Sequence, residues 1–166
     1  MNTTSDKPLS GGYLFELVRD NAKEFFGLRG DEPVRDYVVN LSQAENVNKL
    51  KLDSHWETLA RLFSNGTLDP SAGEPPLQWC FLGGRPMFQG DQSSVMLVRP
   101  DMVRHVAEAL ADADTCWLKS RVEKLTATAD GPIEITDDVA SMLPQLRDFY
   151  NQSAEAGSAV VFAVDH

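Results

Sequence analysis

Long apolar runs are missing from this sequence, and their absence excludes a class of proteins. The longest runs, such as residues 159–164, fall far short of the ~20 apolar residues that a membrane-spanning helix requires. No positively charged segment precedes an apolar stretch near the N-terminus, as a secretory signal would require. We therefore expect no membrane partner and a cytoplasmic location.

Cysteine is scarce as well. Cys80 and Cys116 are the two cysteines, and both have apolar neighbours without the paired spacing of metal or redox motifs. Free cysteines of this kind usually behave as small buried hydrophobic side chains. We predict two buried thiols, no metal site and no other cofactor. A disulfide is the alternative, although nothing in the sequence indicates an oxidising compartment.

Basic residues are outnumbered by acidic ones, with 15 Lys and Arg against 25 Asp and Glu and a formal net charge of -10. Such a field repels phosphate backbones and anionic lipid surfaces, so we expect no nucleic-acid partner. It would instead speed the encounter with a basic protein, and salt would weaken this effect because charges are screened within ~8 Å at physiological ionic strength. The alternative is that the acidity only keeps the protein soluble.

The length and composition are those of one folded domain. The chain has 166 residues, of which 42% are hydrophobic and 24% charged, as is usual for globular proteins. Residues 1–12 are polar, contain Pro8, Gly11 and Gly12, and show no periodicity. We expect a flexible N-terminal lead-in over residues 1–12 and a single domain over residues 13–166.

Hydrophobic periodicity predicts an α+β protein. Several amphipathic helices should pack on a small mixed sheet that includes the C-terminal strand. Pro144 should kink the last helix or start a new one. The predicted elements are helices at 13–26, 43–50, 52–63 (capped by Asp53 or Ser54), 100–110, 114–125 and 136–156, an extended segment at 37–39, strands at 95–98 and 158–164, and a Pro/Gly-rich loop at 67–91.

Several segments, taken in their order along the chain, resemble the YfbM-like bacterial proteins (domain of unknown function 1877). They include Asp53-Ser-His-Trp56-Glu-Thr-Leu59, the stretch from Pro76-Leu77 to Gly83-Gly84, and Leu146-Arg-Asp-Phe149-Tyr150. The match begins near Leu52, and residues 1–40 match only loosely. The resemblance implies a compact α+β domain, but the family supplies no substrate, cofactor or catalytic residue. Ala60 stands where these proteins often have a histidine, so any role of that imidazole is absent here.

Clusters of polar residues offer few candidates for chemistry. Asp53, His55 and Glu57 are close enough in sequence for acid–base or metal chemistry, yet residues two apart do not share a helix face, so a solvated helix start is the preferred interpretation. Asp112 and Asp114 have the Asp-x-Asp spacing of a cation-binding loop, but no further ligands follow. Helix capping is the preferred explanation for this pair of aspartates. The catalytic residues, if there are any, are unknown from sequence.

The Pro/Gly-rich loop at 67–91 is the preferred location of a binding site, because ordered loops often carry binding residues. Trp79 lies in it near Arg85, Met87 and Phe88, a mixture that suits a protein interface if the side chains are exposed. Asp91 follows at the end of the loop. These five residues are the predicted partner-binding candidates.

Three functions are compatible with the sequence. The first is an acidic protein-binding domain, such as an immunity or antitoxin protein that masks a basic toxin or effector. This function does not require catalysis, and we expect a binding protein more than an enzyme. The second is a small-ligand-binding domain or hydrolytic enzyme with a pocket near the Pro/Gly-rich loop. The third is a subunit that forms homo-oligomers, since the sequence leaves the oligomeric state open.

Overall fold

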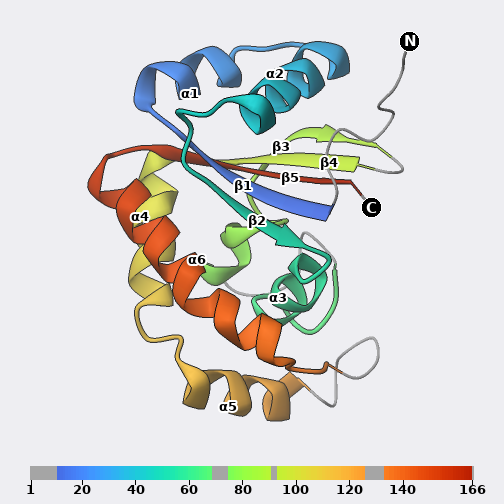
Figure 1. The fold of residues 1–166 in the computed structure, drawn as a ribbon, viewed down its shortest axis with the longest axis vertical. Coiled ribbons are helices and arrows are strands. Elements are labelled where there is room, and N and C mark those ends of the chain that lie inside the picture. The colour runs from blue at the N-terminus through green and yellow to red at the C-terminus, as the bar shows by residue number, and fades with distance from the viewer. Residues whose placement is uncertain (1–10, 69–74, 91–92, 126–132, 166) are drawn as a thin grey trace.

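A five-stranded sheet runs through the middle of the molecule, with helices on both faces (Figure 1). The computed structural model describes residues 11–68, 75–90, 93–125 and 133–165. In chain order the elements are β1 (Gly11–Leu17), α1 (Arg19–Phe26), α2 (Asp31–Gln43), β2 (Lys49–Asp53), α3 (Trp56–Leu62), the 3-10 helix η1 (Leu77–Cys80), β3 (Arg85–Gln89), β4 (Ser93–Val98), α4 (Pro100–Leu110), α5 (Thr115–Leu125), α6 (Asp137–Glu155) and β5 (Ala159–Asp165).

The sheet has the strand order β2-β1-β5-β4-β3, and each neighbouring pair is antiparallel. The α+β class and the C-terminal strand in the sheet are therefore confirmed, whereas the predicted mixed sheet is an antiparallel one. β5 is the central strand, and its residues from Ala159 to Val164 are all buried. A strand covered on both faces needs apolar residues at consecutive positions, which explains its continuous apolar run.

Successive side chains of β5 enter two separate cores, because neighbouring residues of a strand point to opposite faces. Val161 and Ala163 pack with the buried faces of α1 and α2. Val160 and Phe162 pack with α3, η1, α4, α5 and α6 on the other face. The α1–α2 layer is thus a thin cover on one face of the sheet, and the larger helical layer fills the other (Figure 1).

The predicted helix at 13–26 is wrong in its first half, where the chain forms β1. Helices cover both faces of the sheet, so Leu14 and Leu17 are buried on opposite faces of β1, and their spacing resembles that of a helix. Gly11 and Gly12, which the sequence placed in the lead-in, begin this strand; a Cβ atom on Gly12 would lie 2.8 Å from that of Trp56. The rest of the lead-in, residues 1–10, lies outside the described residues.

Three further predictions for the first half are corrected. The extended segment at 37–39 lies inside α2, where Val34, Val38 and Leu41 form the buried face. The predicted helix at 43–50 is the end of α2, a loop and the start of β2. The tryptophan helix begins at Trp56 with His55 before it, because residues up to Asp53 pair with β1.

The second half agrees with the sequence except at residues 85–89, which the sequence placed in the Pro/Gly-rich loop and which form the edge strand β3 by pairing with β4. β4, α4, α5, α6 and β5 occupy the predicted segments, and the Thr136 hydroxyl caps α6 by accepting a hydrogen bond from the Val139 N–H at 3.2 Å. α6 continues across Pro144 as one helix. Cys80 is buried as predicted, but Cys116 is exposed on α5. None of the helices among the described residues is long and apolar enough to cross a membrane.

Candidate functional site

The predicted partner-binding residues separate onto two faces of the sheet. Trp79 lies in η1 and packs, partly buried, against the core of the larger helical layer. Arg85, Met87 and Phe88 lie on the edge strand β3, where Met87 and Phe88 pack against the α1–α2 layer. Asp91 lies outside the described residues. The structure therefore brings together three of the five candidates and places Trp79 elsewhere.

Two contacts between cations and rings connect β3 with the α1–α2 layer. The Arg85 guanidinium lies 4.3 Å from the ring centroid of Phe26 in α1. The Arg35 guanidinium of α2 lies 5.5 Å from the ring centroid of Phe88. A guanidinium over an aromatic face is attracted by the ring quadrupole. Arg85 and Phe88 therefore help to hold the thin layer on the sheet, in addition to any role at the surface.

The Pro/Gly-rich loop adjoins a very small cavity. Its volume is about 10 Å³, and its walls include Phe63, which follows α3, with Gln78 and Gly83. A space of this size holds about one water molecule. This cavity, beside the described part of the loop, is too small for a substrate-sized ligand.

A much larger hollow opens between α2 and the ends of β4 and β5. We call it the α2 hollow, and its volume is about 500 Å³, within the range of roughly 300–1,000 Å³ that is usual for ligand sites. Its walls join segments from distant parts of the chain. They are formed by Asp31, Glu32, Arg35, Asp36, Val38, Val39, Ser93, Ser94, Val95, Ala163, Val164 and Asp165.

Carboxylates dominate the rim of the α2 hollow. The side chains of Asp31, Glu32 and Asp36 are exposed, and among the described residues none of them has a cationic partner within 4.0 Å. Asp31 and Glu32 also complement the dipole at the start of α2, but Asp36 lies beyond this first turn. Asp165 adds a fourth carboxylate from the end of β5, and Arg35 is the single cation of the wall.

The floor of the α2 hollow is apolar. Val38 of α2 faces Val95 of β4 and Ala163 of β5, and all three side chains are buried. A charged rim above an apolar floor suits a guest with a charged end and an aliphatic stem. The sequence analysis missed this site because it predicted an extended segment at 37–39 in place of α2, and because the walls come from segments far apart in the chain.

The polar residues singled out in the sequence pair with neighbouring side chains or cap a helix. The Nε2 atom of His55 lies 3.8 Å from an Asp138 carboxylate oxygen, while Asp53 pairs with Lys51 at 3.6 Å. Asp114 caps α5, since its carboxylate accepts a hydrogen bond from the Trp117 N–H at 2.9 Å. No group of three or more His, Cys, Asp or Glu side chains in the described part of the chain could hold a metal ion.

The comparisons with known proteins agree on the fold. The sequence profile described as "Domain of unknown function (DUF1877)" matches residues 11–163. No curated protein matches the sequence. Among solved structures, YfbM from Escherichia coli, a protein of unknown function, matches with a TM-score of 0.63 and 14% identity, covering 93% of this chain and 99% of YfbM. At this identity the likeness shows a common fold.

Proposed function

The chain belongs to the DUF1877 family, whose function is unknown, and we propose from its surface that it is a binding domain for a basic segment of another protein. The observation that carries this proposal is the α2 hollow, where four carboxylates face one guanidinium above an apolar floor. A lysine or arginine side chain of the partner enters it. The partner class is a basic toxin or effector, and the domain acts in the manner of an immunity or antitoxin protein.

The chemistry of the hollow favours a cationic side chain over other guests. Asp31, Glu32 and Asp36 supply charged acceptors, and a guanidinium can engage carboxylates through two parallel hydrogen bonds. The methylene stem of the guest packs on Val95 and Ala163 of the floor. The overall charge of -10 supports the same partner, because it steers a basic protein toward the surface.

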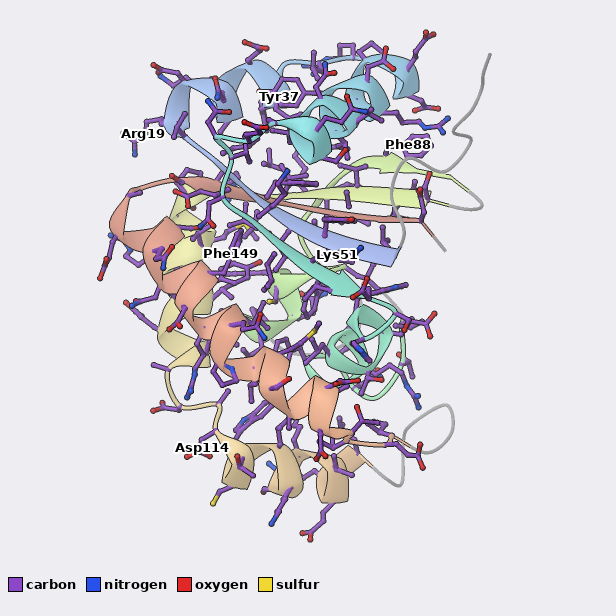
Figure 2. The ribbon with its side chains drawn as sticks, viewed as in Figure 1. Arg19, Tyr37, Lys51, Phe88, Asp114 and Phe149 are labelled. Carbon is purple, nitrogen blue, oxygen red and sulfur yellow. The ribbon has the colours of Figure 1, made fainter. Side chains whose placement is uncertain are left out.

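Phe88 and Arg35 define the edge of the proposed interface. Phe88 lies on β3 beside α2, and Figure 2 shows it at the end of the sheet below that helix. Because Arg35 lies over the Phe88 ring, its charge is held at one side of the hollow. Among the described residues Arg35 makes no ion pair within 4.0 Å with the three rim carboxylates, which leaves them to a cation of the partner.

Neutralising the rim should abolish capture of a basic partner. We expect the variant Asp31→Asn, Glu32→Gln, Asp36→Asn to lose at least about tenfold in affinity, because charged contacts at interfaces contribute more than 1 kcal/mol each when desolvated. The measurement is affinity capture from the source organism's lysate at low and high salt, with the retained protein identified by mass spectrometry. The purified partner is then titrated against each variant by calorimetry.

A matched control removes three carboxylates from the opposite layer. Glu123→Gln, Asp148→Asn, Glu155→Gln changes the net charge equally, and these residues are exposed on α5 and α6. The proposal requires a basic protein that the wild type and this control retain at low salt and that the rim variant loses. Equal retention by both variants would show that only the overall charge matters, and the absence of any basic partner would contradict the proposed function.

A further inference from the structure

A second hollow lies on the same helical layer, at the other ends of β4 and β5. We call it the α1 hollow, and its volume is about 310 Å³. Arg19 of α1 borders it, and Figure 2 shows Arg19 and Phe88 of β3 on opposite sides of the molecule. Its walls are formed by Arg19, Ala22, Lys23, Phe26, Leu97, Arg99, Pro100, Asp101 and Ala159.

The charge of the α1 hollow is opposite to that of the whole chain. Arg19, Lys23 and Arg99 face one carboxylate, that of Asp101, which lies 3.5 Å from the Arg99 guanidinium. Arg85 adds a further cation over the Phe26 ring. In a protein with 15 basic and 25 acidic residues, such a gathering of cations makes a local positive site in a negative field.

Helix stability does not explain Arg19. Arg19 is the first residue of α1, where the helix dipole disfavours positive charge. Lys23 lies in the last turn of α1, where the dipole favours a cation, but it follows Arg19 by four residues, a spacing at which like charges repel. Among the described residues, neither side chain makes an ion pair or a hydrogen bond. Features that break local rules without compensation are typical of functional positions.

The rest of the α1 hollow is apolar. Its floor consists of Ala22, Leu97 and Ala159, and Phe26 of the wall is an aromatic side chain with 38% of its surface exposed. Inorganic phosphate would leave this apolar surface uncovered. An anion with an apolar body would cover the surface and place its charge among the three cations.

We propose that the α1 hollow binds a small monocarboxylate with an aromatic or short aliphatic body. Arg19, Lys23 and Arg99 hold the carboxylate, and the body packs on Phe26 and the apolar floor. The volume of about 310 Å³ is at the lower end of the range for ligand sites, which fits a small acid. This site is separate from the α2 hollow and does not depend on the proposed partner.

The test is a titration of the ¹⁵N-labelled full chain with phenylacetate, followed by NMR. We expect saturable shifts of the amide signals of Ala22, Phe26 and Leu97. The neutral isostere phenylacetamide should bind about tenfold more weakly, because it lacks the charge that the cations recognise. Inorganic phosphate should cause smaller shifts at these amides, because it has no apolar body.

Charge variants localise the site. Arg19→Gln, Lys23→Gln should weaken phenylacetate binding about tenfold, whereas Lys119→Gln, Lys124→Gln should leave it unchanged. The control pair removes the same charge from exposed positions on α5, at the opposite end of the molecule from α1 (Figure 1). The proposal is overturned by equal affinity for phenylacetate and phenylacetamide, by equal effects of the two variants, by phosphate binding as tightly as phenylacetate, or by no saturable shift at these amides.

Discussion

Replacing Phe162 with alanine should lower the free energy of unfolding by about 3–5 kcal/mol. Phe162 is fully buried in the central strand β5, and its ring centroid lies 5.8 Å from that of Trp56 and 5.3 Å from that of Phe81. The side chain thus joins α3, η1 and the sheet in one core. Its loss removes buried apolar surface and leaves a cavity that strand β5 cannot close, since β1 and β4 hold it on both sides.

Urea unfolding followed by circular dichroism at neutral pH measures this effect. Because a domain of this kind is stable by only about 5–15 kcal/mol, the variant should unfold at a much lower urea concentration. The matched control is Phe26→Ala, the same change at a side chain that is 38% exposed, with an expected cost of about 1 kcal/mol. A similar loss in the free energy of unfolding for the two variants would contradict the conclusion that Phe162 joins α3, η1 and the sheet in one core.

The C-terminal half of the fold could be predicted because its local signals agree with its tertiary contacts. Thr136 is a good helix cap, and the apolar residues of α6 follow one helical face that meets the core. After Gly157, which has a positive φ of 68°, the β-branched residues of β5 have no helical spacing to compete with. Each segment would therefore adopt its observed type on local grounds alone.

The N-terminal third could not be predicted because its contacts override the local pattern. β1 is buried on both faces, so Leu14, Phe15 and Leu17 give no alternation of apolar and polar residues. Tyr37 and Val38 belong to residue types that favour strands, yet they lie in α2, where Tyr37 packs on Phe25 with ring centroids 5.1 Å apart. Pairing with β5 and packing on the sheet decide these segments.

The candidate sites, too, depend on tertiary contacts that local sequence patterns do not reveal. Arg85 and Phe88 could be selected from composition, and they do meet the α1–α2 layer. The α2 hollow, however, joins Asp36 with Asp165, and the α1 hollow joins Arg19 with Arg99. Residues so far apart in sequence meet only through the antiparallel order of the sheet, which no local pattern contains. Trp79 was an attractive anchor by type, but η1 directs it toward the core.

Alkaline pH should destabilise the protein through two buried groups. Burial raises the pKa of the Cys80 thiol above its ordinary value of 9.0, against a smaller lowering by a hydrogen bond with Tyr150. Burial also raises the pKa of Tyr150 well above 10.0, and the nearby Cys80 raises it further. The Tyr150 hydroxyl donates a hydrogen bond to the Cys80 carbonyl oxygen at 2.8 Å, so both groups lie in one buried contact.

Whether the free energy of unfolding rises or falls with pH depends on how many protons the folded and the unfolded states bind. Above pH 9 the unfolded chain loses the Cys80 proton while the folded chain keeps it, so the free energy of unfolding falls as the pH rises. The slope should be about 1.4 kcal/mol per pH unit for Cys80, and Tyr150 should add a similar slope above pH 10. Below pH 8 neither group contributes a pH dependence.

Urea unfolding between pH 8 and pH 10.5 separates the two contributions. Cys80→Ala should remove the decline between pH 9 and pH 10 and leave above pH 10 only the slope that Tyr150 contributes. Cys116→Ala removes a thiol that is exposed on α5 and is the matched control. If the Cys80 variant declined as steeply as the control from pH 9 onward, the buried thiol would not be the group that the folded state keeps protonated.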